Sequence, residues 1–403
     1  MTEITDFGLV IAVASGVFAL AVLSNKLSER LAVPAPAIFL LAAALAGRLS
    51  TRLGDELSIR DVERIAVLAL IVILFDGGMR IGWRRFRAAI VPITSLGVAG
   101  TFATAGAMTL AARYFFGFDW TAAGIVGAAV APTDPAVMFS VLGKREVKGR
   151  TGTILEGESG VNDPVGIALM IGMLDLATHA DASFWVVVRE FAVEMTIGLA
   201  VGVAGAFLVI AAVRRIDLPN PALYPLWILA ASGVIYGVTA VAHGSGFLAV
   251  FVAGIVVGGA DLPEKRDVER FHTSLASLAE IVVFVALGLT INKVALDGSV
   301  VLDALLLSLL LAFVARPLVV APLLWPAHLR RGERLFVMWS GLKGAVPILL
   351  AAFALLEHVD RADRIYGIVF VLVAFSVLVQ GASVPFAAAR LGVPMGSSGG
   401  RVS

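Results

Sequence analysis

Apolar stretches long enough to cross a bilayer recur along almost the whole chain, and this feature limits the possible folds most. They run from Phe7 to Ala389 of a 403-residue sequence, without a gap the size of a soluble domain. Hydrophobic residues make up 59% of the chain and charged residues only 15%, whereas soluble domains have roughly 45–50% and about 25%. We therefore expect an all-α polytopic membrane protein with one membrane domain.

The apolar segments predict about thirteen transmembrane helices, because a spanning helix needs roughly 20 mainly apolar residues. The segment 34–50 is short, and two spans are separated only by His243 and Gly244. The approximate bounds of the spans are 7–23, 34–50, 62–79, 88–112, 120–142, 151–176, 184–213, 222–242, 245–260, 273–292, 301–325, 335–356 and 365–389.

The loop charges predict the orientation of the chain. Lys and Arg gather in every second loop, for example at Arg84, Arg85 and Arg87, and cytoplasmic loops are the ones enriched in these residues. This alternation favours an odd number of spans, with the N-terminus outside and the C-terminus in the cytoplasm. The domain boundaries that follow are a membrane domain over 1–390 and a short flexible tail over 391–403, which is rich in Gly and Ser.

Some kinds of chemistry are disfavoured by the residue types. The chain has no cysteine, which excludes disulfides and thiolate sites, and its five histidines are scattered. The net charge of +1 gives no sign of a nucleic-acid partner. We expect no cofactor, and membrane lipid as the surrounding solvent.

The fifth predicted span contains Pro132-Thr133-Asp134-Pro135 in its middle. Proline removes a backbone donor and clashes with the preceding turn, so this helix is expected to break here. Freed carbonyls, the Thr133 hydroxyl and the Asp134 carboxylate would then be oxygen ligands, as in the ion sites of many transporters with broken helices. The alternative is a plain proline kink with an Asp that reaches toward the interface.

The sixth predicted span carries a dense polar group. Asn162 and Asp163 are three and four residues after Ser159, so the three side chains share one helix face. Glu158 is rotated slightly away from this face around the helix axis. Glu156 is expected near the cytoplasmic mouth. Charged residues at membrane depth are functional candidates. The alternative is that the segment is a water-exposed loop.

Two cations lie in late apolar spans, and each needs a counter-charge. We expect Arg316 to pair with Glu158, which would join two helices. Lys343 lies within Gly341–Pro347, a second expected helix break and possible counterpart of the break at Pro132–Pro135. Asp76 lies at the end of the third span, where it either lines an entry funnel or marks the membrane interface.

These motifs, in this order and spacing, resemble those of the cation:proton antiporter-1 family, of the bacterial NhaP type and the related Na+/H+ exchangers. The resemblance covers residues 7–389 and is carried by Pro132–Pro135, Glu156–Pro164, Ala315–Pro317 and Gly341–Pro347. It implies thirteen helices in two inverted six-helix repeats with crossed broken helices, a homodimer, and an elevator-like movement of a core domain. It also implies the inner membrane of a bacterium.

The resemblance also implies roles for individual residues. Asp163 matches the acid that binds cation and proton, Asp134 and Ser159 match its coligands, and Thr133 matches a backbone-carbonyl ligand. These four residues would hold the transported Na+ or K+. The remaining matches are Asn162 as a residue that organises the site, Glu158 and Arg316 as a structural ion pair, and Asp76 as a funnel acid.

Two departures from the family pattern concern a cation and the tail. Lys343 stands where the family usually has arginine, which is a planar fork rather than a point charge. Many potassium-exporting members carry large cytoplasmic regulatory domains, and no such domain is expected in this sequence. Regulation by nucleotide is therefore not expected.

The mechanism predicted from these residues is competition of a cation and a proton for Asp163. One cation exchanged for one proton would be electroneutral, because Asn162 replaces the second acid of the electrogenic relatives. The alternatives are a channel or an electrogenic transporter on the same fold, a transporter of another solute, and a membrane-embedded enzyme that uses Asp134 and Asp163. The preference among Na+, K+ and Li+ is not legible in the sequence.

Overall fold

The computed structural model describes residues 33–49, 57–142, 145–179, 184–294 and 296–397, together with a few isolated positions before residue 24. The predicted first span, 7–23, lies outside these ranges except for those positions. The described elements are α2 (Ala35–Leu49), α4 (Ile59–Ala88), α5 (Ile90–Thr94), η1 (Ser95–Gly100), α6 (Thr101–Phe115), α7 (Trp120–Val130), α8 (Pro135–Leu142), β1 (Arg145–Val147), α9 (Gly149–Thr178), α10 (Phe184–Arg215), α11 (Leu223–Val241), α12 (Gly246–Gly259), α13 (Lys265–Thr290), η2 (Ile291–Lys293), α14 (Gly298–Leu310), η3 (Leu311–Ala315), α15 (Arg316–Leu323), η4 (Trp325–Ala327), α16 (Arg331–Trp339), α17 (Ala345–Leu356), α18 (Ala362–Phe375), η5 (Ser376–Gly381), α19 (Ala382–Arg390) and β2 (Met395–Ser397).

The protein is all-helical apart from the short β1–β2 pair. Within the described ranges, nine helices are long and apolar enough to cross a membrane. Three shorter apolar helices, α2, α12 and α17, accompany them. Each predicted span after the first therefore coincides with one of these helices, and the chain is an integral membrane protein.

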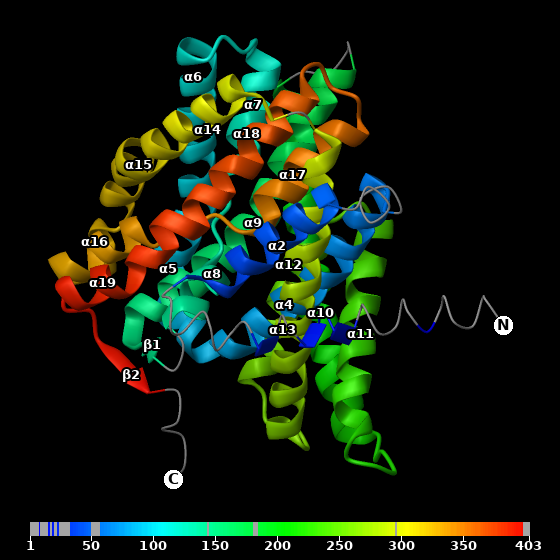
Figure 1. Cartoon of the computed structure of the whole chain (residues 1–403). Helices are drawn as coiled ribbons and strands as arrows, with labels where there is room; N and C mark the ends of the chain where they lie inside the picture. Colours follow the sequence, from blue (N-terminus) through cyan, green and yellow to red (C-terminus); the bar gives the residue numbers. More distant parts are fainter. Residues whose placement is uncertain are drawn as a thin grey trace.

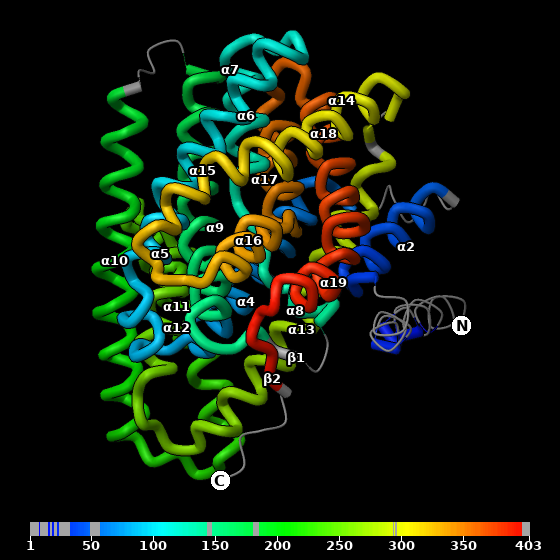
Figure 2. Tube along the Cα trace, turned by 90° about the vertical axis from the view of Figure 1, so that its left-hand side faces the viewer, coloured from blue at the N-terminus to red at the C-terminus, as the bar shows by residue number. Residues whose placement is uncertain are grey.

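The helices form two groups that meet at the centre. Helices α10 to α13 lie together on one side with α4, whereas α14, α15, α16 and α19 lie on the other, and α17 contacts α18 as well as α4 and α13 (Figure 1). Helix α9 packs against α4, α10 and α12 of the first group and also contacts α16 and α17, so it lies between the groups. Figure 2 shows α10 standing at one edge of the molecule and α2 near the opposite edge.

Close packing of glycines joins α4 to α12. A Cβ atom on Gly78 would press against the backbone of Phe251 and Gly254, and one on Gly258 would press against the backbone of Met79. Small residues allow such close backbone approach in membranes, where helix association depends on packing. Helix α4 is also kinked at Gly82, whose φ of 62° favours glycine.

Two helices are interrupted where the prolines and glycines predict it. Residues 131–134 separate α7 from α8, and residues 340–344 separate α16 from α17. The interruptions contact each other directly, since the Asp134 amide donates a hydrogen bond to the Leu342 carbonyl at 2.8 Å. The alternative of a plain kink at Pro132 is wrong, because four residues leave the helix.

Three helices contain a π-helical segment, which the sequence did not predict. These segments are η1, η3 and η5, in the helices formed by α5–α6, α14–α15 and α18–α19. Such segments are frequent at functional sites. Here η3 directly precedes Arg316, and η5 contains Ser376, whose hydroxyl accepts a hydrogen bond from the Lys343 amide at 2.9 Å.

The strands β1 and β2 pair the tail with the loop before α9. Glu146 stands opposite Gly396 in an antiparallel register, and the Lys148 amide donates to the Pro394 carbonyl at 2.9 Å. The Gly and Ser content predicts a flexible tail over 391–403, and within it Met395–Ser397 forms a strand. Backbone pairing of this kind leaves little trace in composition.

Candidate functional site

A cavity of about 70 Å³ lies beside the two helix interruptions, and Asp134 of the first and Ala345 after the second both line it. Asp134, Ser159 and Asp163 line it, together with apolar residues of α4, α12, α13 and α17. Three polar side chains expected at one site are therefore brought together. They come from two elements, the start of α8 and the middle of α9.

Asp163 is a buried acid of this cavity. It is 6% exposed, and its Oδ1 atom has no hydrogen-bond partner within the described part of the chain. Ser159 lies one turn earlier on α9 and is also buried. Since α9 continues as a helix from Gly149 to Thr178, with Pro164 inside it, the alternative of a water-exposed loop is wrong.

Asp134 precedes the first residue of α8. Its Oδ1 atom accepts a hydrogen bond from the Ala136 amide at 2.8 Å, in the manner of a helix cap. The opposite interruption comes very close, because a Cβ atom on Gly344 would collide with the Asp134 carboxylate. The absence of a side chain at Gly344 is what allows Asp134 its position.

This contact makes Gly344→Ala a sharp test of the geometry. The φ of Gly344 is −119°, outside the left-handed region, and the new methyl group would displace the Asp134 carboxylate. We expect the transport rate to fall by about 10- to 100-fold, the range that a small misplacement of a reacting group produces. The control is Gly237→Ala on α11, where nothing lies within 4 Å of the new atom. Equal rates for both variants would contradict the assignment of Asp134 to the site.

Thr133 and Asn162 lie behind the cavity and bind each other. The Asn162 Nδ2 atom donates to the Thr133 hydroxyl at 2.7 Å, and both side chains are buried. This bond ties the first interruption to α9. The Thr133 hydroxyl is therefore engaged with another side chain, and neither residue lines the cavity.

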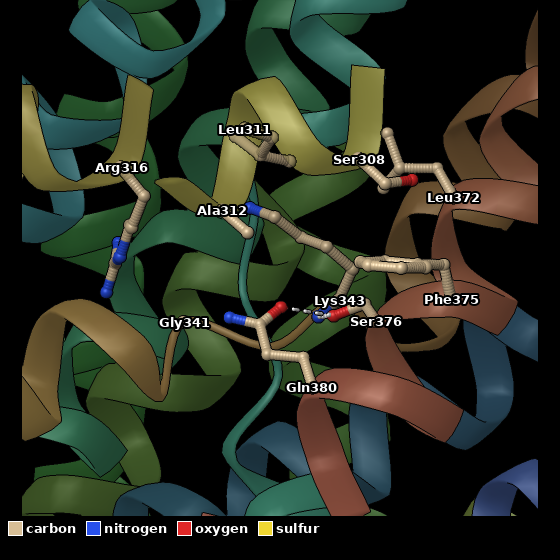
Figure 3. A pocket seen from close by; sticks show the side chains of 10 residues that line it. All are labelled: Ser308, Leu311, Ala312, Arg316, Gly341, Lys343, Leu372, Phe375, Ser376 and Gln380. Carbon is tan, nitrogen blue, oxygen red and sulfur yellow. Dashed lines mark hydrogen bonds between the residues drawn. The ribbon is translucent and has the colours of Figure 1, made fainter. Parts of the chain in front are cut away.

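Lys343 donates hydrogen bonds to two backbone carbonyls that have no helical partner because α7 ends at the first interruption. Its Nζ atom donates to the carbonyls of Ala131 and Pro132, each at 2.9 Å. Figure 3 shows Lys343 and Arg316 on opposite sides of Gly341. The ammonium group thus satisfies the end of α7, which carries partial negative charge, and these two carbonyls already have a donor.

The buried Arg316 lies against Glu158. The Arg316 Nη1 atom is 2.5 Å from the Glu158 Oε1 atom, and both side chains are almost fully buried. Arg316 also donates to the Val337 carbonyl at 3.4 Å. The pair connects α15 to α9 and to the end of α16.

Asp76 is buried inside α4, which runs on to Ala88. Its Oδ1 atom accepts a hydrogen bond from the Thr273 hydroxyl at 2.9 Å, and its Oδ2 atom lies 3.0 Å from the Arg80 Nε atom in an ion pair. Asp76 does not line the cavity, but Arg80 does.

Sequence reasoning missed Glu280. It lies within α13, lines the cavity with Asp134 and Asp163, and its Oε1 atom is buried without a hydrogen-bond partner among the described residues. The signal was available, because an acid among the apolar residues Leu278-Ala279 and Ile281-Val282 is costly in a span. Glu156, expected at the mouth, also lines the cavity.

Resident metal chemistry has no candidate in the described part of the chain. No three His, Cys, Asp or Glu side chains come together there as a metal site would require. The cavity contains carboxylate and hydroxyl oxygens from Asp134, Asp163 and Ser159.

Similarity to known proteins covers nearly the whole chain. The family described as "Sodium/hydrogen exchanger, transmembrane" matches residues 16–390. The K(+)/H(+) antiporter NhaP of Alkalimonas amylolytica is 36% identical over 379 residues, which are 93% of this chain and 66% of that protein. The chain therefore spans slightly less than two thirds of that relative's length.

Two further similarities agree with this match. The Na(+)/H(+) antiporter NhaH of Halobacillus dabanensis is 26% identical over 348 residues, covering 82% of this chain and 83% of that protein. The solved structure of the sodium proton antiporter MjNhaP1 from Methanocaldococcus jannaschii superposes with a TM-score of 0.78 at 21% identity, covering 96% of this chain and 99% of that one. The fold is thus that of a known antiporter.

Proposed function

We propose that this chain, which belongs to the transmembrane sodium/hydrogen exchanger family, exchanges a monovalent cation for a proton across the membrane. The relatives named above are K(+)/H(+) and Na(+)/H(+) antiporters, so Na+ and K+ are the candidate cations. The observation that carries the proposal is the unpartnered Oδ1 atom of the buried Asp163, which faces a cavity shared with Asp134 and Ser159.

Cation and proton compete for Asp163 in this proposal. A buried carboxylate needs either a bound proton or a positive partner. A cation in the cavity would be held by the carboxylates of Asp163 and Asp134 and by the Ser159 hydroxyl. A proton on Asp163 would remove the charge that holds the cation, so that only one of the two is carried at a time.

Electroneutral exchange is part of the proposal. Asn162 carries no charge and is bonded to Thr133, while Lys343 is bonded to the carbonyls of Ala131 and Pro132. Neither group is placed to release a second proton when the cation binds. One cation for one proton would therefore move no net charge.

The wider architecture and assembly are proposed from the resemblance to the cation:proton antiporter family. We propose thirteen helices in two inverted six-helix repeats, with a membrane domain over 1–390 and the tail over 391–403. The protein would act as a homodimer in a bacterial inner membrane, with its N-terminus outside and its C-terminus in the cytoplasm. Its core would swing like an elevator, and no cofactor would be needed.

The test is dissipation of an imposed pH gradient in sealed proteoliposomes, with Na+, K+ or Li+ chloride added in turn and choline chloride as the control. Dissipation by one or more of these cations, unchanged when the membrane voltage is held at zero, is the expected result. For Na+ and Li+ the voltage is held at zero by valinomycin with equal K+ concentrations inside and outside the vesicles. For K+ it is held by equal concentrations of a lipophilic cation on the two sides.

Other outcomes identify the alternatives. A flux driven by voltage alone would indicate a channel or an electrogenic transporter. No response to any of the three cations would contradict the proposal, and would leave another solute or an enzymatic activity to be tested.

A further inference from the structure

Glu280 reaches the cavity from a helix that is not part of the crossed interruptions. Helix α13 packs chiefly against α4 and α2, whereas Asp134 and Asp163 belong to the α7–α8 break and to α9. The cavity is therefore lined by carboxylates from two separate parts of the fold. A movement of the interrupted helices relative to α4 and α13 would change the distance between these carboxylates.

The Glu280 carboxylate has no positive partner in this arrangement. Within the described ranges, no Lys or Arg nitrogen lies within 4.0 Å of it, and its Oε1 atom has no hydrogen-bond donor. The charges that act on it are those of Asp134, which repels, and Arg80, which attracts. Glu280 as a whole is half-buried, but a carboxylate with a buried oxygen left in this state is costly unless another group neutralises it.

Arg80 does not fill that role, because Asp76 already binds it. The Arg80 Nε atom is 3.0 Å from the Asp76 Oδ2 atom, and Thr273 on α13 donates to the other Asp76 oxygen at 2.9 Å. The Arg80 side chain lines the cavity and is 48% exposed. A cation that enters past Arg80 would meet a wall that contains Glu280.

We propose that Glu280 is a second cation-binding residue of this cavity, which takes the transported Na+ or K+ on its way to and from Asp163. This proposal rests on the exchange function proposed above. It differs from a packing role for Glu280, because a binding residue changes the cation concentration needed for transport, whereas a packing residue changes the amount of folded protein.

The test is Glu280→Gln in the proteoliposome assay, with rates measured over a range of NaCl or KCl concentrations at constant ionic strength. Glutamine keeps the shape and removes the charge. We expect the KM for the cation to rise about tenfold, with kcat within about twofold of the wild type, since binding and not the later steps is weakened. Glu280→Asp, which restores the charge on a shorter side chain, should recover most of the KM.

The matched control is Glu269→Gln, the same substitution at an exposed position of α13. It should leave both KM and kcat unchanged. If Glu280→Gln fails to fold, the folded Glu280→Asp variant decides the matter, because a shortened ligand must still shift the KM by about twofold or more. An unchanged KM in the folded Glu280 variants, or a fall in kcat alone, would overturn the proposal.

A direct binding measurement separates this proposal from the exchange function. NaCl or KCl, compared with choline chloride, should raise the melting temperature of the purified wild type, since binding to the native state stabilises it. The rise should require about tenfold more salt in Glu280→Gln. If the wild type transports no cation but shows this shift, exchange fails and the Glu280 site stands. If the shift is equal in both proteins, the site fails whatever the transport assay shows.

Discussion

Asp163→Asn is expected to abolish cation-dependent dissipation of a pH gradient, with an initial rate at least about 100-fold below that of the wild type. The physical reason is that asparagine has almost the same shape but can hold neither a proton nor a net negative charge. Loss of one partner of a buried, desolvated charge interaction commonly costs 2–5 kcal/mol, which corresponds to about 30-fold or more. The measurement is the proteoliposome assay with each cation in turn.

The control for this prediction lies on the same helix. Asp175 is also on α9, and its side chain is 41% exposed, so Asp175→Asn makes the same chemical change away from the cavity. It should retain the wild-type rate. A full rate in Asp163→Asn, in protein that elutes as the wild type does, would show that the exchange does not pass through Asp163.

The second large effect is expected on stability, at the Glu158–Arg316 pair. Glu158→Gln and Arg316→Met should each lower the free energy of unfolding by about 3–5 kcal/mol, because each leaves an unpaired charge in the protein interior. The double variant should regain part of this loss, since it leaves neither charge behind. Denaturation of the purified protein, followed by the fluorescence of its six tryptophans, measures the three variants against the wild type.

A more exposed pair supplies the comparison. The Arg364 Nη2 atom is 2.7 Å from the Asp303 Oδ2 atom, and the two side chains are 31% and 19% exposed. Arg364→Met should therefore destabilise less than Arg316→Met, because solvent screens the charge that remains. If the losses in Glu158→Gln and Arg316→Met simply add in the double variant, the two side chains do not stabilise the protein as a pair.

The helical architecture and its interruptions could be predicted from the sequence because their causes are local. Apolar length predicts spanning helices, and Pro132 with Pro135 predicts a break. The contact of Asp134, Ser159 and Asp163 in one cavity followed from the expectation that polar groups at membrane depth gather together. The number of helices and their repeat symmetry stay predictions.

The remaining features depend on the arrangement of distant segments. Lys343 was expected to need a counter-charge, but it binds two carbonyls instead, which become available only after α7 has ended beside it. The β1–β2 pairing uses backbone atoms, and the π-helical segments have no simple sequence pattern. Glu280 was overlooked for another reason: it is a single acid without neighbouring polar residues, so it does not stand out as a motif.

The bond from the Asp134 amide to the Leu342 carbonyl involves no side chain. Every residue except proline carries the same donor and acceptor, so most substitutions at these two positions leave the bond intact. Substitutions in the surrounding sequence can therefore accumulate without breaking the backbone bond that joins the two helix interruptions. This robustness accords with a fold shared at a TM-score of 0.78 with a protein that is only 21% identical.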